Sequence, residues 1–371
     1  MDLDLSADTL AFRDEVRSFL QANVRPLPSV DTPEGFEAHR EWEHMLADAR
    51  LSVVSWPSGF GGRDASLEQW VVFEAEYYRA QAPLRVSQNG IFLLAPTMFA
   101  HATAEQLERL MPAMARADDI WAQAWSEPEA GSDLAGIKSR AVRTDGGWLL
   151  SGQKTWSTRA TYADRGFGLF RTDPDAERHR GLTYFLFDLH ADGVSVRGIP
   201  QLDGEPGFAE IFLDDVLVPD EDVLGGVGEG WRVAMSTASN ERGLSLRSPG
   251  RYLAAADRLV DLSRDFTDSA LTDRVVDAWI AARAYELHTW ATVTRLEAGG
   301  ALGAESSAGK LFWSQLDIAL HETALDLKGA HGEVADDWTA GYLFSLAGPI
   351  YAGTNEIQRN VVAERLLGLP R

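Results

Sequence analysis

The chain has 371 residues, of which 45% are hydrophobic and 24% charged, as expected for a globular protein of two or three domain-sized units. Its 34 Lys and Arg against 56 Asp and Glu give a formal net charge of −22, which argues against nucleic acid or an anionic membrane as the main partner. Cysteine is absent, so disulfides, thiol chemistry and thiolate metal sites are excluded.

The N-terminal third of the chain is expected to be helical. Apolar residues recur at helical spacing from Leu10 to Leu20, and Ser6 or Asp8 is the expected N-cap. Pro96 marks a kink or a helix start within an apolar run. The acidic N-terminus does not resemble a secretory signal, and no apolar run reaches membrane-spanning length. We therefore expect a cytoplasmic protein that is not held in a membrane.

The pattern changes after Ile120, where short β-prone runs alternate with Gly, Asp and Pro. These runs are 147–152, 183–188, 194–196 and 210–213. From Gly230 the pattern is helical again, with the best candidates at 231–246, 252–266, 273–298 and 310–327. The order predicts an α+β fold. It comprises an N-terminal helical domain at 1–118, a central antiparallel β-barrel or sandwich domain at 119–223 and a C-terminal helical bundle at 224–371.

Three segments, residues 125–133, 152–158 and 351–359, resemble motifs of the acyl-CoA dehydrogenase family. Residues 125–133 (WSEPEAGSD) read as a strand end that enters a Gly-containing loop, which suits a flavin or a diphosphate, although an ordinary turn is the preferred interpretation of this segment by itself. Residues 152–158 (GQKTWST) follow at a fitting distance, and residues 351–359 (YAGTNEIQR) complete the set. Three matches in order argue against coincidence. The resemblance extends over nearly the whole chain, including the order of its domains.

The resemblance implies an FAD-dependent acyl-CoA dehydrogenase. In the family the α-proton of the acyl-CoA goes to a carboxylate, the β-hydride goes to flavin N5, and an electron-transfer flavoprotein takes the electrons. The implied FAD-binding residues are Gln123, Trp125, Ser126, Ser132, Trp156, Thr158, Thr354 and Glu356. The first three would follow the isoalloxazine, Ser132 would bind the diphosphate, Thr158 would approach N5 and the last two would lie beside the adenosine end. Trp156 would pack on the flavin, with core packing as the alternative because the chain has 12 Trp.

The base is the main departure from the family pattern. Most members carry a glutamate just before the Gly-Thr of the C-terminal motif, where this chain has Ala352. A minority places the base on an internal helix before an Arg, and Glu241 and Arg242 match that arrangement. We expect Glu241 to take the α-proton and Arg242 to organise the acyl-CoA site, unless the two are simply a solvated pair. The backbone N–H of Ala352 would still bind the thioester carbonyl, a contribution of roughly 3 kcal/mol.

Two further departures affect the region that, in the family, reaches the FAD of a neighbouring subunit. Residues 261–271 lack the Arg-x-Gln-Phe-Gly element, and Asp326 replaces a Gln. The loss suggests a heteromer with a related chain, holding fewer flavins than chains, as in the bacterial steroid-CoA dehydrogenase subunits that this design resembles. The alternative is a homo-oligomer that binds FAD through other groups. Two other functions remain open, a non-catalytic partner subunit and a flavin oxidase or monooxygenase on the same fold.

No metal site is expected from the histidines. His39 and His44 are not at i, i+4 spacing, and we expect both on a helix surface. His331 lies in a Gly-rich loop and is a weak candidate for a phosphate contact. The basic run 171–180 is interspersed with Asp and Glu and is interpreted as a solvated loop.

Overall fold

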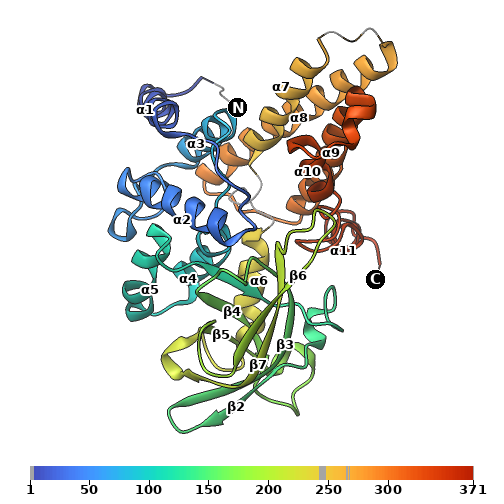
Figure 1. The fold of residues 1–371 in the computed structure, drawn as a ribbon. Coiled ribbons are helices and arrows are strands. Elements are labelled where there is room, and N and C mark those ends of the chain that lie inside the picture. Colours follow the sequence, from blue (N-terminus) through green and yellow to red (C-terminus); the bar gives the residue numbers. More distant parts are fainter. Residues whose placement is uncertain (1–3, 242–247, 265, 267, 371) are drawn as a thin grey trace. The chain divides into compact units, whose positions relative to one another are not determined.

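The computed structural model describes residues 4–241, 248–264, 266 and 268–370, with the backbone alone at 239–241. The chain divides into two compact units. The first takes the described residues of 1–25, 65–82 and 242–371, and the second takes residues 26–64 and 83–241. The observed order of helices, then strands, then helices confirms the predicted α+β fold class (Figure 1). The division into three consecutive domains at 118/119 and 223/224 remains a prediction.

The second unit is built on a mostly antiparallel sheet with the strand order β6-β7-β3-β2-β4-β5-β8, to which β1 adds by pairing with β4. The strands are β1 (Trp121–Ala124), β2 (Arg140–Thr144), β3 (Gly147–Thr158), β4 (Arg165–Arg171), β5 (Leu182–Asp188), β6 (Val194–Ile199), β7 (Phe208–Pro219) and β8 (Val223–Leu224). β1 and β2 run parallel to β4, unlike the other pairs and unlike the prediction. Parallel pairing is possible there because long connections separate these strands from β4.

Four α-helices belong to this second unit within the described residues. They are α2 (Pro33–Asp48), α4 (Ala95–His101), α5 (Ala104–Arg116) and α6 (Gly230–Glu241). A π-helical turn at Asn89–Leu94 leads directly into α4, and Pro96, which has no backbone N–H to donate, lies in the first turn of α4 where the helix changes from π to α. α6 packs against α4 and against strand β5 of the sheet.

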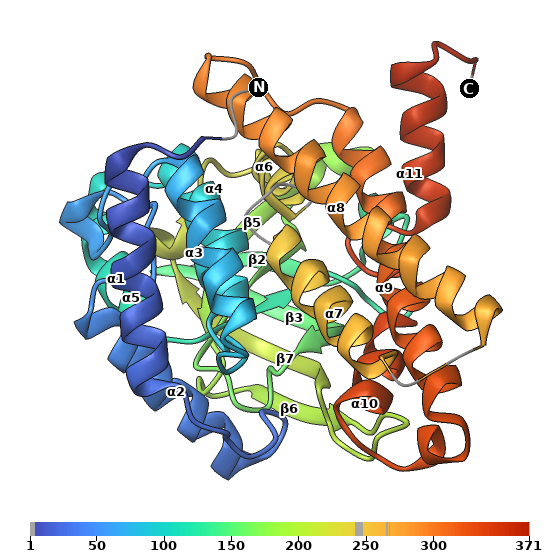
Figure 2. The same ribbon diagram turned by 90° about the horizontal axis from the view of Figure 1, so that it is seen from above.

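The first unit is a helical bundle made from both ends of the chain. Its helices are α1 (Ala7–Asn23), α3 (Leu67–Arg79), α7 (Pro249–Leu262), α8 (Ser269–Glu297), α9 (Glu305–Lys328), α10 (Asp337–Ser345) and α11 (Asn355–Val361). α1 packs on α3 and α3 on α7, while α7, α8 and α9 lie side by side (Figure 2). α10 and α11 pack on α9. Ser6 is the N-cap of α1, as predicted, with its hydroxyl accepting from the Thr9 N–H at 3.1 Å.

Candidate functional site

β1, the loop that follows it and the end of β3 bring together the predicted cofactor residues of the second unit. Gln123 lies in β1, and Trp125 and Ser126 follow directly after it. Trp156 and Thr158 lie at the end of β3, and the N–H of Thr155, the residue before Trp156, donates to the carbonyl of Ser126 at 2.9 Å. This bond joins the loop to β3.

A buried ion pair between Lys154 and Glu127 supports the loop that follows β1. Lys154 is fully buried, and its Nζ lies 2.8 Å from Oε1 of Glu127 and 2.8 Å from the carbonyl of Leu169. Glu127 also accepts from the backbone N–H groups of Lys138 at 2.6 Å and Ser139 at 3.0 Å. Burial lowers the pKa of Lys154 to about 8 against the opposing pull of Glu127. Burial also opposes ionisation of Glu127, but Lys154 and these hydrogen bonds outweigh it and lower its pKa. This pair was not predicted from the sequence, although Glu127 and Lys154 lie within the two motifs at 125–133 and 152–158.

Trp156 is held in an unusual conformation. Its φ is +61°, in the left-handed region, at an irregularity in the pairing of β3 with β7 between Lys154 and Ser157. Its side chain is 60% exposed, and its ring centroid lies 6.2 Å from that of Phe208 in an edge-on arrangement. Trp156 therefore does not pack in the core. A large residue with positive φ indicates a backbone that the surrounding structure has to hold in place, which is common at ligand sites.

The chemistry of the donor set fits a flavin. The side chains of Gln123, Ser126, Ser132 and Thr158 are uncharged and form no hydrogen bond with any other described residue. The backbone N–H groups of Gly131 and Ser132 likewise have no acceptor within the described part of the chain. Neutral donors beside an exposed indole suit a ligand that combines a flat ring with carbonyls and a diphosphate.

The C-terminal motif lies in the first unit and forms a tight turn before α11. Ala352 and Gly353 have φ values of +58° and +75°, and Nε2 of Gln358 donates to their carbonyls at 3.0 and 3.1 Å. The N–H of Ala352 has no acceptor among the described residues. Thr354 is the N-cap of α11 and accepts from the N–H of Ile357 at 3.2 Å, while Glu356 is exposed and pairs with Arg359.

The predicted base lies at the edge of the described chain. Glu241 is the last residue of α6, and its side chain is outside the described part, as is all of Arg242. One turn earlier, Thr237 is fully buried and shares hydrogen bonds with the hydroxyls of Thr97 at 2.9 Å and Tyr184 at 3.2 Å. α6 is therefore anchored to α4 and β5 just before the position of the predicted base.

One interpretation from the sequence changes with the structure, and one acidic residue gains a partner that the sequence did not predict. His39 is 5% exposed, and its ring nitrogens lie 2.8 Å from the carbonyl of Leu84 and 3.3 Å from that of Pro28. The prediction that His39 is a surface residue was wrong, because its two backbone partners satisfy the ring inside the unit. Asp326 is not isolated, since it forms an ion pair with Arg274 on α8.

The connection that lacks the Arg-x-Gln-Phe-Gly element is short. α7 ends at Leu262 and α8 begins at Ser269, so only six residues, partly described, separate them. No group of three His, Cys, Asp or Glu able to hold a metal ion occurs among the described residues. None of the described helices combines the length and the apolarity needed to cross a membrane.

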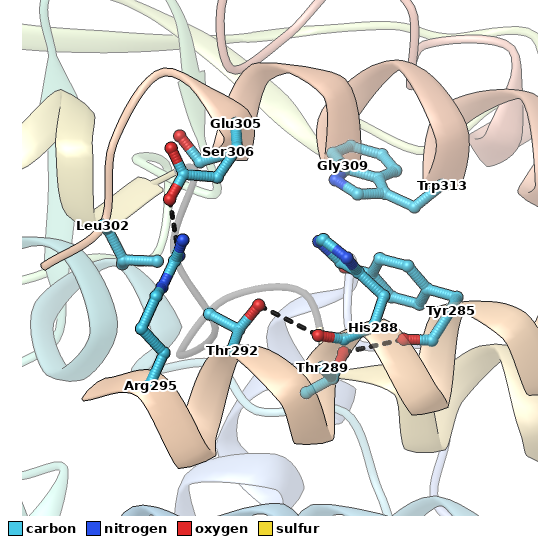
Figure 3. Close-up of a pocket in the computed structure, with 10 residues that line it drawn as sticks. All are labelled: Tyr285, His288, Thr289, Thr292, Arg295, Leu302, Glu305, Ser306, Gly309 and Trp313. Carbon is cyan, nitrogen blue, oxygen red and sulfur yellow. Dashed lines mark hydrogen bonds and ion pairs between the residues drawn. The ribbon is translucent and has the colours of Figure 1, made fainter. Parts of the chain in front are cut away.

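A separate pocket lies in the first unit between α8 and α9 (Figure 3). Its lining residues are Tyr285, His288, Thr289, Thr292, Arg295, Leu302, Glu305, Ser306, Gly309 and Trp313. Arg295 and Glu305 form an ion pair at one end, and the aromatic rings of Tyr285 and Trp313 lie at the other. None of the predicted site residues lines this pocket.

Comparison with known proteins gives a consistent result along the whole chain. Family models match the acyl-CoA dehydrogenase N-terminal domain at residues 6–118, the middle domain at 122–216 and the C-terminal domain at 228–367. The acyl-CoA dehydrogenase IpdE1 of Mycolicibacterium smegmatis is 38% identical, with 97% of each chain covered. IpdE1 of Mycobacterium tuberculosis is also 38% identical, with 98% of each chain covered.

Two similar solved structures cover the chain completely. The "Tcur3481-Tcur3483 steroid ACAD" has a TM-score of 0.89 at 25% identity, with 100% of each chain covered. The ChsE4-ChsE5 complex from Mycobacterium tuberculosis has a TM-score of 0.85 at 25% identity, again with 100% of each chain covered.

Proposed function

The chain belongs to the acyl-CoA dehydrogenase family, and from this premise we propose that it uses Glu241 to remove the α-proton of an acyl-CoA thioester. The family membership makes it an oxidoreductase, whereas the assignment of the base rests on position. Glu241 ends a helix that is anchored one turn earlier, and it precedes Arg242, which would organise the acyl-CoA. A carboxylate held away from water is a suitable base for this weakly acidic proton.

One observation carries the proposal, namely the backbone of the turn at Ala352. The position that holds a catalytic carboxylate in most of the family carries only a methyl group here, yet the turn keeps a left-handed residue with an N–H that no described residue accepts. That N–H would donate to the thioester carbonyl and stabilise the enolate that forms when the proton leaves. Glu241 and Ala352 would thus divide between them two tasks that one residue position performs in most of the family.

The cofactor proposed for this site is FAD, which when bound would accept the hydride that leaves the β carbon. Gln123, Trp125 and Ser126 would orient its ring, Trp156 would pack on it and Thr158 would lie near its N5. The remaining contacts would be made by Ser132 at the diphosphate and by Thr354 and Glu356 at the adenosine end. The unpaired neutral donors and the exposed Trp156 support this assignment. An electron-transfer flavoprotein would reoxidise the enzyme.

The substrate and the assembly are proposed from the similar structures. One of them is described as a steroid ACAD and another as a complex of two differently named chains. We therefore propose a bulky, steroid-derived acyl-CoA as the substrate and a related acyl-CoA dehydrogenase chain as the partner. The missing element between α7 and α8 supports the second part, since this chain lacks what relatives offer to a neighbour's FAD.

The base assignment is tested by Glu241→Gln in the flavin-loaded protein, purified with any subunit that accompanies it. The amide cannot accept the proton, so we expect dye reduction and the exchange of the substrate α-proton in D₂O to fall by about 10²–10⁴-fold. The assay would use butyryl-, isobutyryl-, octanoyl- and choloyl-CoA. Glu229→Gln is the matched control, because Glu229 is an exposed residue just before the same helix and forms an ion pair with Arg232.

The outcomes separate the competing functions. Unchanged turnover in Glu241→Gln would refute the base assignment. A wild-type protein that binds no FAD and gains none with a partner would favour a non-catalytic subunit. Reduced flavin that air reoxidises rapidly would favour an oxidase or monooxygenase on the same fold.

A further inference from the structure

We infer that one face of α9 acts as a template for the turn at Ala352, and that Lys310 and Asn355 are positioning residues for its N–H. The inference rests on the proposed function, in which that N–H binds the thioester carbonyl. Lys310, Trp313 and Ser314 lie three and four residues apart, so their side chains share one face of α9. All three are buried, and each is tied to a residue in or beside the turn.

The polar part of this template fixes the residue that follows the turn. The Lys310 Nζ donates to Oδ1 of Asn355 at 2.7 Å, and the Ser314 hydroxyl lies 3.2 Å from the same amide. Asn355 is 5% exposed, and its backbone N–H donates to the carbonyl of Pro349 at 2.8 Å, which closes the loop. A buried ammonium is costly unless it is hydrogen-bonded, so this arrangement has to be kept in one geometry.

The aromatic part fixes the residue that precedes the turn. The rings of Trp313 and Tyr351 are stacked with centroids 6.0 Å apart, and Phe344 approaches Tyr351 at the same distance. Beneath them Arg251 lies 5.0 Å from the Phe344 ring and donates to Oδ2 of Asp317 at 2.7 Å. Ring pairs of this kind have a defined geometry, so they hold Tyr351 in place. Tyr351 precedes Ala352 in the chain, and Asn355 follows it.

The turn is therefore fixed on both sides, at Tyr351 and at Asn355, and Ala352 between them has a strained backbone. Left-handed backbone at Ala352 persists only if its surroundings enforce it. Gln358 donates to the carbonyls of Ala352 and Gly353, while the N–H of Ala352 has no acceptor among the residues that the structure describes. A donor that is misplaced by about 1 Å can cost about 100-fold in rate, so the template sets how well the N–H can serve catalysis.

The test compares Asn355→Leu with Asn355→Asp in the flavin-loaded protein together with any subunit that copurifies. Leucine removes the acceptor for Lys310, whereas aspartate keeps an oxygen at the same place. We expect Asn355→Leu to lower kcat about 10- to 100-fold and to change KM by less than about 3-fold, on whichever of butyryl-, isobutyryl-, octanoyl- or choloyl-CoA the wild type oxidises. Asn355→Asp should recover most of the lost kcat. Equal kcat values for wild type and Asn355→Leu would overturn the inference.

A second measurement needs no substrate. Hydrogen exchange of the peptide spanning 347–358 should become faster in Asn355→Leu and in Ser314→Ala, and unchanged exchange in both would overturn the inference. Thr289→Val is the control, because its hydroxyl is a buried donor in the same bundle (to the carbonyl of Tyr285 at 3.0 Å) and lies in the separate pocket (Figure 3). If Asn355→Leu does not fold, Ser314→Ala alone decides the question. A wild type that oxidises no acyl-CoA would refute the proposed function, while the exchange data would still decide the role of the template.

Discussion

Lys154 and Lys310 are both fully buried, and each lies beneath a stretch of backbone that the proposed chemistry uses. Lys154 pairs with the carboxylate of Glu127 under the loop after β1, whereas Lys310 donates to a neutral amide beside the turn at Ala352. Neither side chain is expected to touch the substrate. Both lysines make the backbone around them hard to move, because its displacement would break the hydrogen bonds that these buried side chains form with Glu127 and Asn355.

The pair Glu127–Lys154 predicts a particular dependence of stability on pH. The pKa of Lys154 falls from its ordinary value of 10.5 to about 8, so the unfolded chain binds this proton more tightly than the folded protein does. The resulting penalty is present in full below pH 8 and is relieved as the pH rises toward 10.5. Over that window the wild type should gain up to roughly 3 kcal/mol of unfolding free energy relative to a Glu127→Gln/Lys154→Met double variant.

Urea unfolding of both proteins at pH 7.5 and pH 10 would measure this difference, since other titrating groups are common to the two and cancel. Curves that shift in parallel would contradict the prediction. The single variant Lys154→Met supplies the control. It leaves the Glu127 carboxylate buried without its cation, so it should be less stable than the double variant at pH 7.5 by about 3 kcal/mol.

At the scale of elements, α9 is the central helix of its unit. It contacts α7, α8, α10 and α11, and it carries both the template for the Ala352 turn and the buried Asp317–His321 pair. Gly341 of α10 packs directly against the ring of His321, where an added Cβ would lie 2.3 Å from two ring atoms. The close approach of α10 to α9 therefore depends on the absence of a side chain at this one position.

Two glycine-to-alanine substitutions in this unit should have opposite signs. Gly341→Ala places a methyl group against a buried ring that is already fixed by a hydrogen bond to the carbonyl of Asp317, and should lower the unfolding free energy by about 2 kcal/mol. Gly309→Ala lies within α9 with no atom within 4 Å of the new Cβ, and should raise it by about 0.5–1 kcal/mol. Thermal unfolding of the two variants checks both signs. A stabilising Gly341→Ala would show that α10 does not pack on His321 as described.

The sequence was informative where a pattern is local. The β-prone runs lie in β3, β5, β6 and β7, and the N-cap of α1 is Ser6, one of the two residues that the sequence offered for it. The grouping of elements was not predictable, because α1 and α3 join the C-terminal helices while α2, α4 and α5 join the sheet. Periodicity shows that a helix has an apolar face, but it does not identify the surface on which that face packs.

The same limit applies to the site. Motif positions led to the proposal of a site at the loop after β1, the end of β3 and the Ala352 turn, because the residues of each motif are contiguous in the chain. The buried partners were missed, since Lys310 and Asn355 are 45 residues apart and neither belongs to a pattern that marks a lysine as buried. The pairing of Asp326 with Arg274 was missed for the same reason, as a contact across 52 residues has no local signature.

At the scale of the whole molecule, the proposed assembly with a related chain would supply what this chain lacks. A net charge of −22 means that the anionic groups of FAD and CoA must be met by local cations, and the element that supplies an Arg to a neighbour's FAD in the family is missing between α7 and α8. The ion pair with Arg274 reduces the repulsion that the carboxylate of Asp326 would exert on an anionic cofactor group. The same ion pair engages Arg274, a cation that could otherwise attract that group. A related chain that retains the element would complete an FAD site on this chain and receive no equivalent help in return.

This asymmetry predicts fewer flavins than chains. Coexpressed with a related chain that carries the Arg-x-Gln-Phe-Gly element, this protein should form a stable heteromer with about one FAD per pair of chains, because only one of the two sites in each pair is complete. Expressed alone, it should retain less than one FAD per chain after gel filtration. Absorbance at the flavin band with light-scattering mass would measure both quantities. A stable homotetramer with one FAD per chain would contradict the prediction, because it would show that other groups in this chain replace the missing element at its own interface.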